Sequence, residues 1–131
     1  MSDSQSSLSE FISEELELTQ LHQLGRQLAN EVARLGKVVA VYECDFAISS
    51  KKYKLEVAKA KVLYKDSRMS PTMINAIAET SQCAVEASNE LQCVEALLLI
   101  GKAELEGRDK QYTMVKKLID LKVQELRVFR G

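Results

Sequence analysis

Residues 38–67 read VVAVYECDFAISSKKYKLEVAKAKVLYKDS and carry an apolar repeat into a lysine-rich segment. The apolar residues that lead into this stretch recur at alternating spacings of four and three, which is the period of a heptad repeat. The repeat consists of Leu28, Val32, Leu35, Val39, Tyr42, Phe46, Ser49 and Tyr53. After Tyr53 the apolar residues spread more widely around the helix, which loosens a coiled coil. The pattern predicts a long helix with one apolar seam.

The first helix is predicted over about residues 7–66, behind a flexible polar tail at residues 1–6. Ser7 and Glu10 have the spacing of a capping box, in which each side chain bonds to a backbone amide at a helix start. Gly36 lies within this helix, and a glycine in a helix interior costs about 1 kcal/mol relative to alanine. Gly36 is therefore a point where the helix can bend.

A second helix is predicted over about residues 71–130. Ser70 provides an N-cap and Pro71 occupies the first helical position, a combination typical of helix N-termini. The heptad positions of this helix, which are mostly apolar or small, are Ile74, Ile77, Ser81, Ala84, Ser88, Leu91, Val94, Leu98, Gly101, Leu105, Arg108, Tyr112, Val115, Ile119, Lys122, Leu126 and Phe129. Its first half is rich in alanine and serine, and small residues let helices approach closely. Gly101 is the second point where the chain can bend.

The two predicted helices have similar lengths and a short connection, which predicts an antiparallel hairpin or coiled coil. A chain that folds at Met69 places residue i opposite about residue 138 − i. This register sets Gly36 opposite Gly101, and Cys44 opposite Cys93. The predicted fold class is therefore all-α.

Charge along the sequence favours the same pairing. Residues 51–68 carry seven bases and two acids, a net +5, and residues 69–107 carry one base and six acids, a net −5. Residues 1–20 carry five acids and no base, and residues 108–131 carry seven bases and three acids, a net +4. A chain that folds near Met69 lays blocks of opposite sign on each other, which selects register more than it stabilises.

The hairpin is expected to form one helical domain over residues 7–131, because 131 residues correspond to a single domain. Two packed helices cover only one side of each other and leave other apolar positions exposed. These surplus positions include Val41, Ile48, Leu97, Leu99 and Ile100. We therefore expect a homo-oligomeric bundle in which copies of the hairpin cover these residues.

The composition is that of a soluble protein, with 46% hydrophobic and 28% charged residues. A net charge of −1 argues against a protein that coats nucleic acid or membrane over its whole surface. No apolar run reaches the length of a membrane span, and the first residues lack the order of a signal peptide. Cys44, Cys83 and Cys93 lack the close pairing of a zinc or redox motif, so we expect buried, reduced thiols in a reducing cytoplasm.

The sequence contains no residue pattern that indicates catalysis. His22 is the only histidine, and its polar neighbours Thr19, Gln23 and Arg26 do not form a set that resembles a Ser–His–Asp triad. The carboxylates are spread along the helices as on a solvated face, and the sequence has no EF-hand, Walker loop or dinucleotide fingerprint. We therefore expect a non-enzymatic protein without metal or cofactor.

A cluster of basic residues between positions 51 and 68 is the strongest candidate for a binding site. It consists of Lys51, Lys52, Lys54, Lys59, Lys61, Lys65 and Arg68, with Tyr53 and Tyr64 nearby. Basic side chains with interleaved aromatics suit single-stranded nucleic acid, because the cations neutralise phosphates while the rings stack on bases. In the competing interpretation the same lysines face glutamates of the second helix, and Tyr53 belongs to the seam.

The lysine-rich helix ends in Leu63-Tyr64 near its break. Features of the C-terminal helix are Leu91-Gln92, Leu97-Leu98, Leu105, Arg108, Lys116, Ile119, Arg127, Phe129 and the final Gly131. Over residues 38–131 this pattern resembles the UvsY-type recombination mediators of T-even-like phages, which are small helical proteins of similar length. The chain departs from the family at Glu106-Gly107-Arg108, where a basic Lys-Ser-Arg-Gly turn would supply a second nucleic-acid contact.

The resemblance implies an oligomer that binds single-stranded DNA, engages a single-strand-binding protein and helps to load a RecA-like recombinase, without bond chemistry of its own. It implies a host cytoplasm as the location of a phage-encoded chain. The residues that would contact phosphates are Lys51, Lys52, Lys54, Lys59 and Lys61. The alternative class is a helical adaptor, scaffold or inhibitor that recognises another protein through exposed apolar residues such as Leu97, Leu99 and Ile100.

Overall fold

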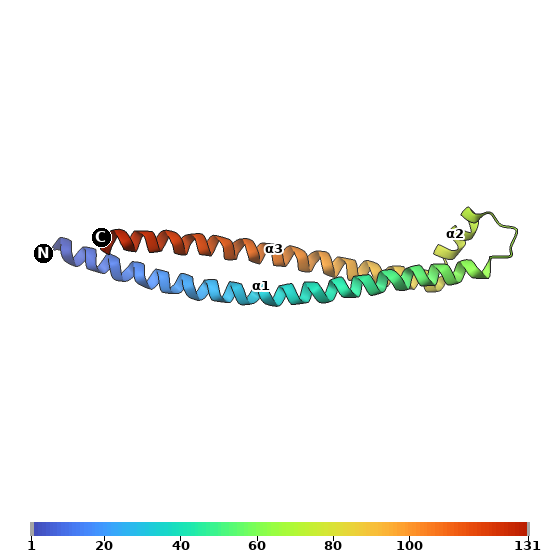
Figure 1. Ribbon diagram of the computed structural model, residues 1–131, viewed down its shortest axis with the longest axis horizontal. Coiled ribbons are helices and arrows are strands. Elements are labelled where there is room, and N and C mark those ends of the chain that lie inside the picture. Colours follow the sequence, from blue (N-terminus) through green and yellow to red (C-terminus); the bar gives the residue numbers. More distant parts are fainter. Residues whose placement is uncertain (1, 131) are drawn as a thin grey trace. The chain divides into compact units, whose positions relative to one another are not determined.

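The computed structural model describes the backbone of residues 2–130 and the side chains of Ser13 and residues 15–128. Within these limits every regular element is a helix, which confirms the predicted all-α fold. The elements are α1 (Ser2–Leu63), α2 (Pro71–Glu79) and α3 (Gln82–Arg130), as labelled in Figure 1.

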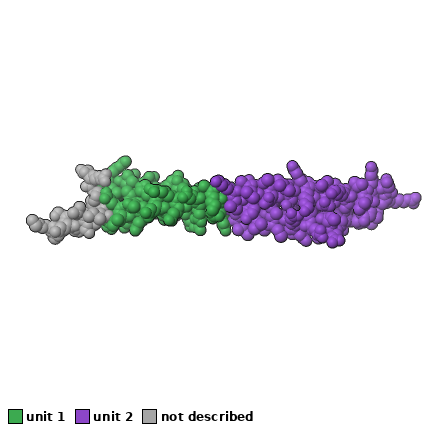
Figure 2. Space-filling model, turned by 90° about the horizontal axis from the view of Figure 1, so that it is seen from below, with its two compact units in different colours: residues 1–36, 104–131 green, residues 37–103 purple. Residues whose placement is uncertain are grey.

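The chain divides into two compact units, which are coloured separately in Figure 2. Unit 1 consists of residues Met1–Gly36 and Glu104–Gly131, and unit 2 consists of residues Lys37–Ala103. Each unit contains a segment of α1 packed against a segment of α3, and unit 2 also contains α2. The predicted helical hairpin is therefore confirmed within each unit.

Ion pairs between the helices show that α1 and α3 are antiparallel in both units. The pairs are Glu17–Lys122 at 2.8 Å and Glu31–Arg108 at 3.4 Å in unit 1, and Glu43–Lys102 at 3.9 Å and Lys52–Glu90 at 2.9 Å in unit 2. In each unit the residue number rises along α1 while that of its partner on α3 falls. Two of these pairs, Glu17–Lys122 and Lys52–Glu90, join the charge blocks that the sequence predicted to meet, whereas Glu31 and Glu43 lie in residues 21–50, which carry no net charge.

The seam of unit 1 is aliphatic. Leu28 and Leu35 on α1 and Val115 and Leu126 on α3 are buried, as the apolar repeats predict. Gly25 is also buried, and a Cβ atom placed on it would lie 3.6 Å from Cγ1 of Val115. The helices of this unit are therefore in direct van der Waals contact at the predicted seam.

The core of unit 2 narrows to small residues near the turn. Val39 and Leu98 are buried at the end away from the turn. The buried residues nearer the turn are small, namely Ser49 and Ala60 on α1, Ala78 on α2, and Ala84 and Ala87 on α3. Small side chains let helix backbones approach closely, so the alanine-rich half of the predicted repeat performs the expected role.

The turn between α1 and α2 contains the N-cap that was predicted for the start of the second helical region. After α1 ends at Leu63, the backbone N–H of Tyr64 donates to the carbonyl of Lys61 at 3.1 Å, which tightens the chain into a turn. The hydroxyl of Ser70 then accepts a hydrogen bond from the N–H of Met73 at 3.3 Å. This N-cap, followed by a proline, confirms the predicted start of the second helical region.

The second helical region is interrupted, so the prediction of one helix over residues 71–130 is wrong. Thr80 and Ser81 separate α2 from α3. The hydroxyl of Thr80 donates to the carbonyl of Ala76 at 3.0 Å, and that of Ser81 donates to the carbonyl of Ala78 at 2.8 Å. Such side-chain bonds compete with the helical ladder, but Thr19 and Thr113 form the same kind of bond inside the continuous helices α1 and α3, so these bonds accompany the break and do not by themselves explain it.

The break changes the register of the hairpin. The predicted fold point at Met69 places Lys52 opposite residue 86, but Lys52 pairs with Glu90, one helical turn further along α3. Along the chain, α2 and the break at Thr80 and Ser81 come between α1 and α3. The segment that reverses the chain is therefore longer than the sequence pattern indicates. The predicted pairing direction is correct. The predicted register agrees within one residue with the ion pairs of unit 1, Glu17–Lys122 and Glu31–Arg108, and is wrong in unit 2.

The predicted approach of Gly36 to Gly101 is wrong for the same reason. A Cβ atom on Gly101 would lie 3.4 Å from both Cγ2 of Val39 and Cδ2 of Tyr42, so the neighbours of Gly101 are these two residues of unit 2. A Cβ atom on Gly36 would have no described atom outside its own helix turn within 4 Å. Both helices continue through these glycines without a break, and a bend at them stays a prediction.

The predicted burial of the three cysteines is wrong, and so is the predicted position of Cys44 opposite Cys93. Cys44, Cys83 and Cys93 are free thiols and all three are exposed, because they lie beside the seam positions and not on them. Glu43 pairs with Lys102, so the adjacent Cys44 does not lie opposite Cys93. Exposed thiols need a different explanation from the core packing that the sequence indicated.

The start of α1 differs from the prediction. The helix begins at Ser2, ahead of residue 7, so the predicted capping box of Ser7 and Glu10 is not its N-terminus. The side chains of residues 1–12 lie outside the described part, and the flexibility of the tail stays a prediction.

Candidate nucleic-acid interface

All five lysines predicted to contact phosphates lie on α1 in unit 2 and are exposed. They are Lys51, Lys52, Lys54, Lys59 and Lys61. α1 has its seam at Val39, Ser49 and Ala60, all buried, and the lysines occupy positions between these residues. The helical repeat therefore turns the lysines outward, but toward more than one side of the helix.

Lys52 is engaged by α3. Its Nζ donates a hydrogen bond to Oε2 of Glu90 at 2.9 Å, and both side chains are about half exposed. The hydrogen bond to Glu90, and then the negative charge of Glu90, raise the pKa of Lys52 above its ordinary value of 10.5. For this one lysine the competing interpretation, pairing with a glutamate of the second helix, is correct.

The other four lysines are not held by α3. Lys59 forms an ion pair with Glu56 of its own helix at 3.6 Å. Lys51, Lys54 and Lys61 form no ion pair with any side chain that the structure describes. Three of the five predicted cations are therefore open to an external anion.

Two of the open lysines share a surface hollow with a tyrosine. Tyr53, Lys54 and Lys61 line a hollow of about 280 Å³ in unit 2, together with Val57, Ala58 and Glu79. Tyr53 is half-buried, so it belongs to the seam and also contributes to the surface. Two ammonium groups can neutralise phosphates while the ring offers an apolar surface for a base.

Glu79 is a residue of this hollow that the sequence analysis missed. It is the last residue of α2, and it brings a carboxylate to the same hollow as Lys54 and Lys61. The break after α2 places it there, and that break was not predicted. An acid at this position limits how closely a phosphate can approach on that side.

Tyr64 does not share the hollow of Tyr53. It lies in the turn after α1 and is half-buried, and its carbonyl accepts a hydrogen bond from the Ser67 hydroxyl at 2.7 Å. Lys65 and Arg68 of the same turn are exposed. The structure thus brings Tyr53, but not Tyr64, into a shared site with two of the predicted lysines.

A second hollow that joins a tyrosine to basic side chains lies in unit 1. His22, Arg26, Tyr112 and Lys116 line a hollow of about 270 Å³, together with Gly25, Ala29 and Ile119. The Nζ of Lys116 lies 4.7 Å from the centre of the Tyr112 ring, a cation–π contact. None of the lining residues is acidic. Sequence analysis could not find this hollow, because α1 and α3 must be in register before these residues meet.

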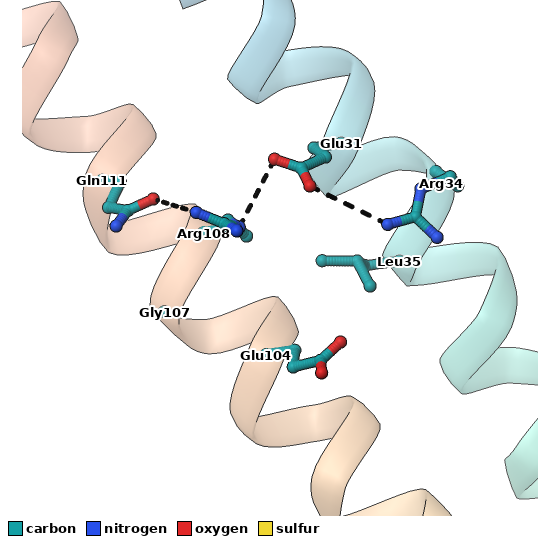
Figure 3. Close-up of a pocket in the computed structure, with 7 residues that line it drawn as sticks. All are labelled: Glu31, Arg34, Leu35, Glu104, Gly107, Arg108 and Gln111. Carbon is teal, nitrogen blue, oxygen red and sulfur yellow. Dashed lines mark hydrogen bonds and ion pairs between the residues drawn. The ribbon is translucent and has the colours of Figure 1, made fainter.

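The hollow around Arg108 in unit 1 has a different character (Figure 3). It has a volume of about 410 Å³ and is lined by Glu31, Arg34, Leu35, Glu104, Gly107, Arg108 and Gln111. Arg108 lies 3.4 Å from Glu31 through its Nε and donates to Gln111 at 2.9 Å. Glu31 also lies 3.9 Å from Arg34. The arginine side chains here are committed to internal partners and leave this hollow unsuited to phosphate.

The described residues give no sign of a metal centre, since no group of three or more His, Cys, Asp or Glu side chains is placed to hold an ion. No helix within the described range is long and apolar enough to cross a membrane. The sequence matches no protein-family model, and no curated protein or solved structure is significantly similar to it. Function must therefore be argued from the geometry of this chain.

Proposed function

We propose that this protein is a non-enzymatic accessory protein that binds single-stranded DNA, as a recombination mediator does. The observation that supports the proposal is that each unit has a hollow in which a tyrosine and cationic side chains lie together. In unit 2 these are Tyr53, Lys54 and Lys61, and in unit 1 Tyr112, Lys116 and Arg26. A flexible strand can place a phosphate on the cations and a base against the ring of either hollow.

The overall charge of the protein is compatible with such local binding. The net charge is −1, so a strand is attracted by the two hollows and not by the surface as a whole. Two separated contacts on one chain raise the affinity of a long strand, because the second contact forms at a high effective concentration. Binding is therefore expected to strengthen with oligonucleotide length.

The recombination context rests on the resemblance of the sequence to UvsY-type mediators. In that role the protein would engage a single-strand-binding protein and a RecA-like recombinase on the strand. The apolar residue Leu99 of α3 is exposed by 60% and provides a site for such a protein contact. Leu97, Leu99 and Ile100 together favour the second candidate function, a helical adaptor that binds only protein.

Fluorescence anisotropy with a labelled oligonucleotide tests the DNA-binding proposal. The Lys54→Gln and Lys61→Gln double variant should weaken binding and reduce the slope of log affinity against log salt by about 0.7 for each lost phosphate contact. Lys37→Gln is the control, because Lys37 is exposed in the same unit and lines neither hollow. Absence of binding at low salt, or an equal effect of the control, rejects the proposal and leaves the adaptor.

A further inference from the structure

A second apolar row runs along the outside of α1 in unit 2. Val41, Ile48, Leu55 and Val62 follow one another at intervals of seven residues, which is the repeat of a coiled-coil position. Their exposed fractions are 58, 61, 54 and 67%. Because the seam of α1 is already covered by α3, this row lies on a surface that the hairpin itself does not cover.

α3 carries a corresponding row on its own outer surface. Leu97 and Ile100 are exposed by 46 and 58%, and Cys93 is exposed one turn before Leu97. The same row continues toward α2 with Glu90 and Glu86, both exposed. The α3 row is therefore apolar at one end and acidic at the other.

The Lys52–Glu90 ion pair shows that both rows lie on one side of unit 2. On α1, Ile48 and Leu55 are four residues before and three residues after Lys52, which are the neighbouring positions on a helix surface. On α3, Cys93 is three residues after Glu90. Since Lys52 and Glu90 meet at 2.9 Å, the two rows flank this ion pair. We call this surface the Lys52–Glu90 face.

The opposite side of the hairpin has fewer of these features. Glu43, which pairs with Lys102, precedes Lys52 by nine residues, about two and a half turns, and so points to the other side of α1. Leu99 is three residues before Lys102 and belongs to that side. Leu99 therefore provides a comparison residue that is exposed but lies off the Lys52–Glu90 face.

The Lys52–Glu90 face is complementary to itself. Because Glu43 meets Lys102 and Lys52 meets Glu90, Val41 and Ile48 of the α1 row are level with the apolar end of the α3 row, Leu97 and Ile100. The lysines of α1, Lys52 and Lys59, are level with the acidic part of α3. A second copy rotated by half a turn about an axis parallel to the helices sets α1 of each copy against α3 of the other. Val41 and Ile48 of one copy then meet Leu97 and Ile100 of the other, while Lys52 and Lys59 come near the glutamates of α3.

We propose that the Lys52–Glu90 face docks the same face of a second copy of this chain, giving a twofold symmetric four-helix contact within unit 2. This interface is isologous, so each contact occurs twice. Pairing of two α1 rows with each other is disfavoured, because it brings the lysines of one copy to those of the other. The proposal goes beyond DNA binding and does not depend on it, because Lys54, Lys61 and the unit 1 hollow are not part of this face.

A hollow on the Lys52–Glu90 face has a suitable occupant in the second copy. It has a volume of about 250 Å³ and is lined by Lys52, Glu56, Cys83, Glu86, Ala87 and Glu90. In the proposed dimer Leu55 of the second copy is level with Glu86 and meets the small side chains of Cys83 and Ala87. A large apolar side chain inserted between smaller ones of the facing helix is the usual packing of helix bundles.

The apolar contact is tested by sedimentation velocity of the full chain without DNA. Ile48→Asn should weaken self-association by at least about tenfold, which corresponds to the loss of one buried aliphatic side chain. Leu99→Gln is the matched control, because Leu99 is 60% exposed and Ile48 is 61% exposed. The control should change the dissociation constant by less than about twofold. Circular dichroism checks that both variants keep the helical content of the wild type.

The charge contact is tested by exchanging signs between copies. Lys59 is one helical turn beyond Leu55, so its side chain is within reach of Glu86 of the other copy. Lys59→Glu alone brings two acids near each other at both symmetric contacts, and Glu86→Lys alone brings two bases near each other, so each variant should self-associate less than the wild type. An equimolar mixture should form a heterodimer, because both of its contacts then join opposite charges. Changes within one hairpin are the same in the mixture as in the separate variants, so recovery on mixing reports only the contact between copies.

The results separate this proposal from DNA binding. Weakening by Ile48→Asn, together with recovery of the mixed charge variants, supports the proposed dimer whether or not an oligonucleotide binds. A wild-type chain that stays monomeric, an assembly that Ile48→Asn leaves intact, or a mixture that does not recover each overturns it. Loss of DNA binding with an intact dimer rejects only the proposed function.

Discussion

Leucine substitutions at two glycines test the packing of the hairpin directly. Gly101 is buried against the segment of α1 that belongs to unit 2, and a Cβ atom on Gly101 would already lie 3.4 Å from Val39 and from Tyr42. The remaining atoms of a leucine would have to enter the space that these side chains fill. Overpacking of this kind costs about 1–3 kcal/mol. At Gly36 the same side chain meets open space.

The comparison of the two variants isolates the overpacking cost. Replacing a helical glycine by leucine gains up to about 0.8 kcal/mol of helix propensity, and this gain is common to both positions. We therefore expect Gly36→Leu to stabilise the protein slightly. Gly101→Leu should be less stable than Gly36→Leu by about 1–3 kcal/mol.

Urea denaturation followed by circular dichroism measures this difference at one fixed protein concentration. Gly101→Ala provides an internal control, because its single added atom makes an ordinary van der Waals contact and should not reduce the free energy of unfolding. Equal stabilities of Gly36→Leu and Gly101→Leu would refute the packing of Val39 and Tyr42 around Gly101.

Three further predictions concern the turn, the Lys52 ion pair and the thiols. Ser70→Ala should lower the free energy of unfolding by about 1 kcal/mol in urea denaturation, because the Met73 N–H loses its capping acceptor. The pKa of Lys52 is raised in the folded state, so its pairing with Glu90 stabilises the protein fully below about pH 10.5. A titration of unfolding should show that the difference between wild type and Lys52→Gln shrinks above this pH; a difference that grows contradicts the pairing. A thiol reagent should label Cys44 rapidly in the folded protein at any protein concentration, whereas Cys83 and Cys93 on the Lys52–Glu90 face should react rapidly only at concentrations where the proposed dimer dissociates; protection of Cys44 would contradict its exposed position.

The sequence predicted the seam well because burial on a long helix depends on a repeat that can be counted. Leu28, Leu35 and Val39 are buried as predicted, and Ser49, the one polar residue of the repeat, is buried with them. The antiparallel direction was also predictable, since opposite charges along the chain match in only one direction. Neither conclusion required the exact position of the turn.

The register of unit 2 could not be predicted because it depends on the break between α2 and α3, which the apolar repeat does not reveal. Ser81 fits the apolar repeat of a continuous helix, yet α2 ends at Glu79 and α3 begins at Gln82. The resulting shift moves Glu90 opposite Lys52, the position predicted for Glu86. A periodic pattern continues through such a break without any visible change.

The candidate site was predictable only in part for the same reason. The outward position of Lys54 and Lys61 follows from the seam of α1. Which lysine is neutralised by α3 depends on the register, and so does the hollow that joins Arg26 to Tyr112 and Lys116. The residues of that hollow are far apart in the sequence and have no shared motif.

The affinity difference between a single-stranded oligonucleotide and a duplex of the same sequence tests the proposed role of the two hollows most directly. Bases are free to stack on Tyr53 and Tyr112 only in the single strand, so the wild type should bind it more tightly at the same salt concentration. Replacing both tyrosines by leucine should remove the preference while the cations still bind both forms. Equal or tighter binding of the duplex by the wild type, or no binding of either form, would contradict the proposed interface.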